Sequence, residues 1–504
     1  MKSYIYIQSS EILWQKIAEE LYAKGIAKPV LWIGGYEDKQ RIEVLGAEII
    51  EFYDQYSIKN KTVYEGSDHA FDTSRKYHYV KEICIKMMDR EDLVGNFRNI
   101  DRECFFNYWL IVVQEKLKKH KPDFLLMSES PHSFLQYLIY EVCKFKRIPI
   151  FSFGQITKFA PVLYLRKGIE GKPEKIQETR KDLALHRKII ERAKNEINKE
   201  IKNRGIVGAK IMEYQIFHDN ERRRIKNRIK KGARSLVKKT TQIIPQRYSH
   251  RFRKSRDTIL QELDRRLYTG TGYRWQNIEK TQSKIWKELK YSYDTHATNT
   301  IPAKYIYLTL HYEPERNSCP DGLEYHEQVK IIKILRRIAP TDVTILVKEH
   351  PSQFLSSRMG YQGRSPFFYE YVSKIEGVQF VTINNKSEKL IQDSLFTASI
   401  GGTSAIESSF QGKIALVFGN PWFIGCPNII KYDESVIFTD IINYKIYSQK
   451  KIVQWIENFI DEFGIPGVQN PSGLRNFSDM NFQEIRTEAT HLICDKLKGI
   501  LIDL

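Results

Sequence analysis

The segment from Thr397 to Trp422 constrains the fold of this chain most strongly. Two short apolar runs, 397–400 and 414–418, flank a polar turn and a stretch of helical character. Glycines let a ligand approach the backbone, and hydroxyls beside the free N–H groups of a helix's first turn bind anions. This pattern predicts the strand, turn, helix and strand of a doubly wound parallel sheet. The turn contains Gly401, Gly402, Thr403 and Ser404.

Glu407 follows this turn by one turn of helix, where a carboxylate can receive two ribose hydroxyls. Together with the helix dipole, which favours negative charge at a helix N-terminus, the segment can hold a nucleotide. The structural alternative is a glycine-rich helix N-cap with no ligand.

A second motif follows the apolar run 343–347. Lys348 and His350 come directly after this run, and Pro351 stops the strand and restricts the backbone at the histidine. We expect both side chains to point into the crevice at the carboxyl ends of the strands, where they neutralise a phosphate leaving group. A His-Pro pair alone is usually structural, but its order and spacing before the glycine turn favour the functional interpretation.

The composition indicates a folded protein of two or three domains, with 504 residues, 41% hydrophobic and 12% aromatic residues. The six cysteines are scattered, which predicts neither a disulfide framework nor a zinc site. The chain has no Asp-x-Asp pair, so we expect no metal and no cofactor. Residues 1–8 are typical of a first strand rather than a secretory signal, and no apolar run is long enough to cross a bilayer. We therefore expect a cytoplasmic protein.

Alternating strand and helix patterns predict an α/β fold with two Rossmann-like domains facing a cleft. The first domain covers 1–167 on the acceptor side, and the second covers 301–445 on the nucleotide side. Residues 168–300 are expected to form a helical, strongly basic insertion. Residues 446–504 contain two amphipathic helices, 449–463 and 482–498, that are expected to pack across the cleft.

Glu129 and His132 follow the predicted strand 123–127, whose last four residues are apolar, and so lie at its carboxyl end. Glu129 is a candidate base or acceptor-binding residue, and its structural alternative is a partner for the next helix N-terminus. His132 is a candidate contact residue for the acceptor or the membrane, and its structural alternative, local packing at the helix start, is favoured.

The stretch from Arg222 to Arg256 holds fifteen Lys or Arg and no acidic residue, out of a net charge of +19. Apolar residues recur at helical spacing over 222–244, which favours a basic amphipathic helix on an anionic membrane surface. A solvated helix packed on its own protein is the next alternative. Nucleic acid is disfavoured because the stretch has few aromatic residues to stack on bases. The candidate contact residues are Arg222, Arg223, Arg224, Lys230, Lys231, Lys238 and Lys239.

Three stretches, 310–315, 347–351 and 402–412, together resemble the bacterial capsular polysaccharide biosynthesis proteins. This group includes Kdo and related nonulosonic-acid transferases with the two-domain GT-B architecture. The resemblance is specific over about 300–425 and general over the N-terminal half. It implies transfer of an acidic ulosonic sugar, such as Kdo or pseudaminic acid, from a CMP-linked donor. The acceptor would be a lipid-linked or growing surface glycan, at the inner face of the inner membrane.

The resemblance also implies roles for individual residues. His350 would contact the donor phosphate, Thr403 and Ser404 would bind it, and Glu407 would bind the ribose. A carboxylate near the sugar would act as base or stabilise the cation, and the candidates are Glu129, Glu313 and Glu315. For Glu313 and Glu315 the alternative is a loop carboxylate that forms an ion pair with Lys348 or a neighbour.

Other functions remain open at this stage. A CDP-glycerol glycerophosphotransferase or a UDP-sugar transferase or epimerase would use similar strand ends. A non-catalytic capsule assembly or export factor would retain the same fold.

Overall fold

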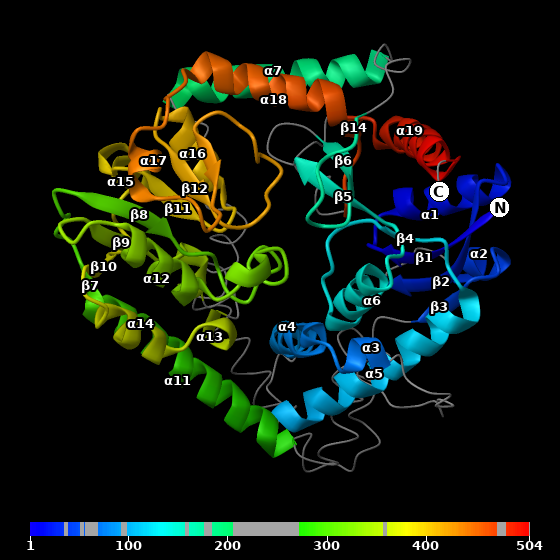
Figure 1. Cartoon of the computed structure of the whole chain (residues 1–504), viewed down its shortest axis with the longest axis horizontal. Helices are drawn as coiled ribbons and strands as arrows, with labels where there is room; N and C mark the ends of the chain where they lie inside the picture. Colours follow the sequence, from blue (N-terminus) through cyan, green and yellow to red (C-terminus); the bar gives the residue numbers. More distant parts are fainter. Residues whose placement is uncertain are drawn as a thin grey trace, which may run out of the picture.

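The computed structural model contains two seven-stranded sheets with helices around them (Figure 1). It describes residues 1–34, 39–50, 55, 69–91, 98–156, 161–175, 184–204, 272–355, 360–470 and 480–502. We call the unit built on each sheet the first lobe and the second lobe, in chain order. The basic stretch 222–256 lies outside the described residues, as do its candidate contact residues Arg222, Arg223, Arg224, Lys230, Lys231, Lys238 and Lys239.

The first sheet has the strand order β14-β6-β5-β4-β1-β2-β3. Strands β1 to β5 pair in parallel, whereas β6 pairs antiparallel with β5 and with β14. The strands are β1 (Lys2–Gln8), β2 (Ala27–Gly34), β3 (Glu48–Ile50), β4 (Phe124–Met127), β5 (Ile150–Ile156), β6 (Val162–Lys167) and β14 (Ile465–Pro466).

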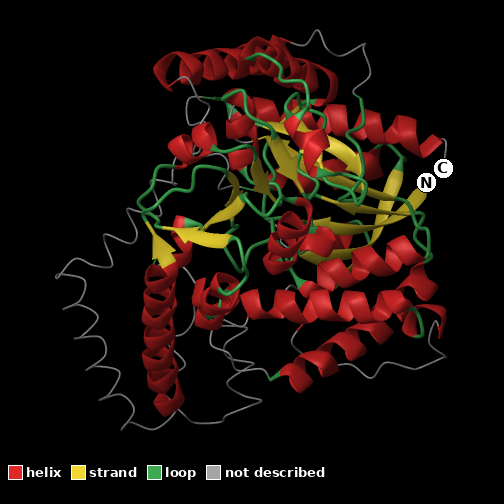
Figure 2. Ribbon diagram, turned by 60° about the vertical axis from the view of Figure 1, so that its left-hand side comes forward, coloured by secondary structure: helices red, strands yellow, loops and turns green. Residues whose placement is uncertain are grey.

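Strand β1 shows why helices cover both faces of this sheet (Figure 2). Tyr4 and Tyr6 pack in one hydrophobic cluster with α1 and α19, whereas Ile5 and Ile7 pack in another with α4, α5 and α6. Successive side chains of a strand point to opposite faces, so a strand that is apolar throughout must be covered on both. The helices of this lobe are α1 (Ile12–Ala23), α2 (Lys39–Val44), α3 (His69–Asp72), α4 (Arg75–Glu91), α5 (Asn99–His120), α6 (Phe134–Phe145) and α19 (Phe482–Ile502).

The second sheet has the strand order β13-β12-β11-β8-β9-β10-β7, and all of its pairs are parallel. Its strands are β7 (Ala297–Thr298), β8 (Tyr305–Thr309), β9 (Thr344–Lys348), β10 (Val378–Val381), β11 (Thr397–Ser399), β12 (Ala415–Val417) and β13 (Ile429–Lys431). The helices around it are α11 (Gly272–His296), η4 (Leu323–Tyr325), α12 (Gln328–Ile338), η5 (Pro351–Phe354), α13 (Gly360–Gly363), α14 (Pro366–Ser373), α15 (Ser387–Asp393), α16 (Thr403–Phe410) and α17 (Phe438–Ile442).

In each sheet the order of strand addition reverses once. In the first lobe the chain adds β2 and β3 on one side of β1 and β4 on the other; in the second it adds β9 and β10 on one side of β8 and β11 on the other. Open parallel sheets bind ligands at such reversal points, outside the carboxyl ends of the strands. The two lobes together form the α/β, GT-B-like architecture that the sequence predicted.

A third hydrophobic cluster joins the lobes. It contains Tyr164 of β6, Phe410 of α16 and Phe459 of α18 (Gln449–Phe463), and the rings of Tyr164 and Phe459 lie 5.6 Å apart. Figure 1 shows α18 beside α7 (Ala184–Arg204), above both sheets. After α18 the chain adds β14 to the first sheet and packs α19 against α1. The C-terminal segment thus runs from the second lobe to the first.

Among the helices of the described residues, none is long and apolar enough to span a membrane.

Candidate functional site

The glycine turn between β11 and α16 is held by a histidine from the neighbouring strand. The Gly401 N–H donates to His311 Nε2 at 3.3 Å, and the Gly402 N–H donates to Ser399 Oγ at 3.0 Å. The Nε2 atom of His311 also lies 3.1 Å from Ser399 Oγ. These contacts join the carboxyl ends of β8 and β11, the reversal point of the second sheet.

Residue 402 is a glycine because the turn has little room for a side chain at this position. A Cβ atom at Gly402 would lie 3.1 Å from Ser399 Oγ and 3.4 Å from two ring atoms of His311. The φ angle of Gly402 is −71°, which any residue adopts. Absence of a side chain, rather than backbone freedom, is therefore what the turn requires.

His311 stays uncharged in this setting. Its burial, together with the charges of His350 and Arg364, lowers its pKa to about 3. Because Nε2 accepts the Gly401 N–H, the single proton of the neutral ring resides on Nδ1. His311 was not among the predicted site residues; its position two residues after β8 was the available signal.

Hydroxyl groups line the first turn of α16. Ser404 Oγ lies 2.7 Å from Oγ1 of Thr309, the last residue of β8. Thr403 is exposed at the first helical position, and Ser404 is half-buried. The predicted hydroxyls thus meet a further hydroxyl, from Thr309, that the sequence analysis did not identify.

Lys348 is the last residue of β9, at the same carboxyl edge of the sheet as the ends of β8 and β11. Its Nζ donates to the Asn385 carbonyl oxygen and to Ser387 Oγ, and burial lowers its pKa to about 8. The Tyr307 hydroxyl lies 3.2 Å from the same Ser387 Oγ. Among the contacts of the described residues, Lys348 has no ion pair with Glu313, the alternative considered from the sequence.

Glu407 is buried one turn into α16. Burial raises the pKa of Tyr307, and the negative charge of Glu407 raises it further. Glu407 therefore lies near the Tyr307 hydroxyl, so the predicted ribose carboxylate and Lys348 share one region of the site.

His350 is exposed, and its charge contributes to the lowered pKa of His311. Pro351 begins the short helix η5. The Nδ1 atom of His350 accepts the Ser352 N–H at 3.2 Å, and the ring centre of His350 lies 6.4 Å from that of Tyr312. With Nδ1 accepting, the neutral ring carries its proton on Nε2. This tautomer can donate a hydrogen bond to an anion.

A buried ion pair lies behind the two histidines. The Glu349 carboxylate accepts from Arg364 Nε at 2.9 Å and from the Tyr369 hydroxyl at 2.8 Å. Glu349 Oε1 also accepts the His350 N–H, and Arg364 donates to the His311 carbonyl oxygen at 3.1 Å. The pair thus orients the backbone of both histidines.

The candidate carboxylate Glu313 is buried in a network of two glutamines. Gln328 Nε2 donates to Glu313 Oε1 at 2.9 Å, while the same amide pairs with both backbone polar groups of His311. Gln353 pairs with both backbone polar groups of Glu313. The backbone carbonyl of Glu315, the third candidate carboxylate, accepts from Cys319 and Ser318. Glu313 therefore supports the strand end that carries His311.

Glu129 faces the second lobe. Its Oε2 lies 2.9 Å from His132 Nε2 and 2.9 Å from Nη1 of Arg316, which belongs to the loop after β8. Burial alone raises the pKa of Glu129, but His132 and Arg316 outweigh burial and hold it below its usual value of 4.5. The carboxylate is therefore ionised at neutral pH. Sequence analysis placed Glu129 and His132 at this strand end, and the structure adds Arg316.

No group of three or more His, Cys, Asp or Glu side chains within the described ranges is arranged to hold a metal ion.

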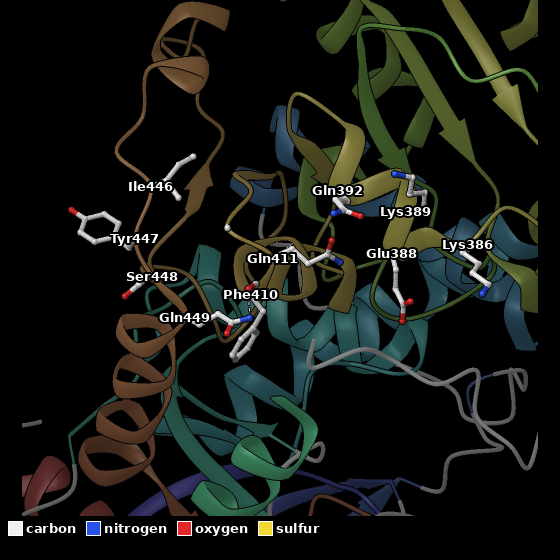
Figure 3. A pocket seen from close by; sticks show the side chains of 11 residues that line it. Lys386, Glu388, Lys389, Gln392, Phe410, Gln411, Ile446, Tyr447, Ser448 and Gln449 are labelled. Atoms are coloured by element: carbon white, nitrogen blue, oxygen red, sulfur yellow. Dashed lines mark hydrogen bonds between the residues drawn. The ribbon is translucent and has the colours of Figure 1, made fainter. Parts of the chain in front are cut away.

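A separate hollow of about 690 Å³ lies on the outer side of the second lobe, between α15, the end of α16 and the start of α18 (Figure 3). Gln449 is one of its lining residues and donates to the Phe410 carbonyl oxygen at 2.8 Å. Its lining contains none of the residues predicted from the sequence.

Solved structures with some similarity to this chain include carbohydrate-active enzymes. A β-Kdo 2,7 transferase, KpsC of Thermosulfurimonas dismutans, is 14% identical with a TM-score of 0.21, and the match covers 34% of this chain and 52% of that chain. The UDP-GlcNAc 2-epimerase of Methanocaldococcus jannaschii is 12% identical with a TM-score of 0.21, over 95% and 99% of the two chains. The Neisseria meningitidis UDP-GlcNAc 2-epimerase is 10% identical with a TM-score of 0.20, over 100% and 99%.

No protein-family model matches the sequence. No curated protein matches it.

Proposed function

We propose that this protein transfers an acidic ulosonic sugar, such as Kdo or pseudaminic acid, from a CMP-linked donor to a cell-surface polysaccharide acceptor. The proposal rests on one observation. The reversal point between β8 and β11 brings a neutral histidine, a glycine turn and the hydroxyl-lined start of α16 together. Such a constellation binds a phosphate through N–H groups, hydroxyls and the helix dipole.

The charge of the site suits a single phosphate. Thr403 and Ser404 face the phosphate position, and His350 donates a hydrogen bond from Nε2 to a phosphate oxygen as the nucleotide departs. Lys348, with its pKa of about 8, carries its charge at neutral pH beside them. Hydrogen bonds and charge that strengthen on the leaving group lower the barrier without a metal ion.

The nucleoside and the acceptor occupy opposite sides of the phosphate. Glu407 receives the ribose hydroxyls, beside Tyr307 and Lys348. Glu129 of the first lobe faces the sugar, where an ionised carboxylate either accepts the acceptor's hydroxyl proton or stabilises the cationic sugar carbon.

A donor screen tests the proposal. The protein is incubated with CMP-Kdo, CMP-pseudaminate, CDP-glycerol or UDP-GlcNAc and an extract of lipid-linked glycan, and products are identified by mass spectrometry. A glycan longer by one ulosonic residue supports the proposal. Transfer of glycerophosphate, or transfer or epimerisation of the UDP-sugar, overturns it in favour of the corresponding enzyme.

Thermal unfolding with CMP separates these enzymes from a non-catalytic assembly or export factor. We expect CMP to raise the melting temperature and His350→Ala to reduce that rise. A melting temperature that no nucleotide changes contradicts the proposal.

Because the proposed acceptor is lipid-linked, the proposed reaction takes place at the inner face of the inner membrane. The basic stretch 222–256 is the proposed membrane contact. Anionic vesicles should bind the protein in low salt and release it as salt rises. Replacing the seven basic contact residues with Gln should abolish that binding. Equal binding by the wild type and this variant contradicts the membrane assignment.

A further inference from the structure

Arg316 crosses from the second lobe to the carboxylate of the first. Its Nη1 atom lies 2.9 Å from Glu129 Oε2 and 3.1 Å from His132 Nε2, and its Nε lies 3.4 Å from Asp321 Oδ2. Residues 129 and 316 are 187 positions apart in the chain, so only the approach of the two lobes creates the contact.

The loop that carries Arg316 is held in place by helix α4 of the first lobe. Arg90 donates to the carbonyl oxygens of Cys319 and His132, and Lys86 donates to the carbonyl oxygen of His326 at 3.0 Å. The loop that presents the arginine is therefore anchored to the first lobe at two positions that follow it in the chain.

The burial of Glu129 makes the charge of Arg316 important for its ionisation. The residue is 8% exposed, and a buried carboxylate without a cation favours its protonated form. His132 faces Glu129 from its own turn, and Arg316 faces it from the loop after β8. Asp321 and Glu315 lie near the Arg316 guanidinium. From β6, Arg166 donates to the hydroxyl of Ser130, next to Glu129. Arg316 is the cation that the second lobe contributes to this group.

The two oxygens of the carboxylate differ in their contacts. Within the described part of the chain, the hydrogen bonds of Glu129 from His132 and Arg316 both go to Oε2. These two contacts hold the carboxylate through one oxygen and do not involve Oε1.

We propose that Arg316 is a positioning residue, supplied by the donor-binding lobe, that keeps the first-lobe base Glu129 ionised and oriented. The base is then competent only while the two lobes are together. This inference rests on the proposed transferase function, because it assigns a partner to the base of that reaction.

The first test is the pH dependence of kcat/KM for sugar transfer. Relative to the wild type, Arg316→Met should move the acidic limb upward by one pH unit or more and lower kcat at pH 7 by tenfold or more. The donor KM should change less than threefold, and Arg316→Lys should recover much of the wild-type profile. An unchanged acidic limb in Arg316→Met overturns the inference.

Lys175→Met is the control, because it removes another ion pair between distant segments, with Glu462 of α18, and touches neither Glu129 nor the loop that carries Arg316. It should retain the wild-type acidic limb. An equal upward shift in Lys175→Met overturns the assignment to Arg316.

The second test needs no turnover. A double-mutant cycle combines Glu129→Gln with Arg316→Met and measures urea unfolding at pH 7. We expect the two substitutions to be coupled by fivefold or more in the unfolding constant. Absence of coupling overturns the inference even in an active transferase. Coupling without transfer from any CMP-sugar overturns the proposed function and leaves the contact between the lobes established.

Discussion

The Nε2 atom of His311 lies 3.1 Å from the Oγ atom of Ser399, so a residue beyond β8 holds the last residue of β11. The same nitrogen accepts the Gly401 N–H. These contacts order the glycine turn without a ligand, which would lower the cost of binding the proposed phosphate there. The site also gains a neutral acceptor rather than a cation, because His311 has a pKa of about 3.

Gly402→Ala should weaken CMP binding by about tenfold, which corresponds to about 1.4 kcal/mol. The added methyl group would contact Ser399 and His311 and displace the turn. Isothermal titration of CMP measures the change. The control is Gly412→Ala, where φ is +71° and no atom lies within 4 Å of the new Cβ. This control should lose on the order of 1 kcal/mol of stability through backbone strain and bind CMP as the wild type does. A wild-type Kd for CMP in Gly402→Ala would contradict the proposed phosphate turn.

CMP affinity should fall as pH rises through about 8. Burial lowers the pKa of Lys348 to about 8, so its positive charge is present below that pH and lost above it. Lys348→Arg should hold its affinity to about pH 10, since guanidinium remains charged there. Titrations of CMP from pH 6.5 to 9.5 measure both. An affinity that stays level across this range in the wild type would exclude Lys348 from charge recognition.

His350→Ala and Glu407→Ala should lose activity by different routes. The first removes a donor to the leaving group, so kcat should fall by about a hundredfold. The second removes the ribose contact, so the donor KM should rise by about tenfold with a smaller change in kcat. Steady-state kinetics on the donor separates the two, and wild-type kinetics from both variants would refute the assignment.

Arg364→Met should destabilise the second lobe by about 3–5 kcal/mol, because it leaves the carboxylate of Glu349 buried without its cation. Urea unfolding followed by circular dichroism measures the loss. The control is Lys374→Met, which removes an exposed partner of Glu370 and should cost about 0.5 kcal/mol or less. Equal midpoints for the two variants would mean that the buried pair does not hold the strand end.

Several strands of both lobes were predicted from local sequence. The run 343–347 was predicted as a strand, and β9 covers Thr344–Lys348; the helix predicted at 449–463 is α18 with the same bounds. Hydrophobic periodicity of two or 3.6 residues reports which faces of an element are covered. The same pattern also located the polar residues at the ends of β4, β9 and β11, because these residues interrupt apolar runs.

The partners of those polar residues followed from packing alone. Glu349 meets Arg364 fifteen positions away, and the His311 N–H meets Gln328 seventeen positions away. Arg316 reaches Glu129 from the other lobe, and β14 joins the first sheet from beyond the second. Periodicity describes how one element is buried but not which distant polar group satisfies a buried charge. That choice depends on strand order and on how two lobes and their loops approach, so it exists only in the folded chain.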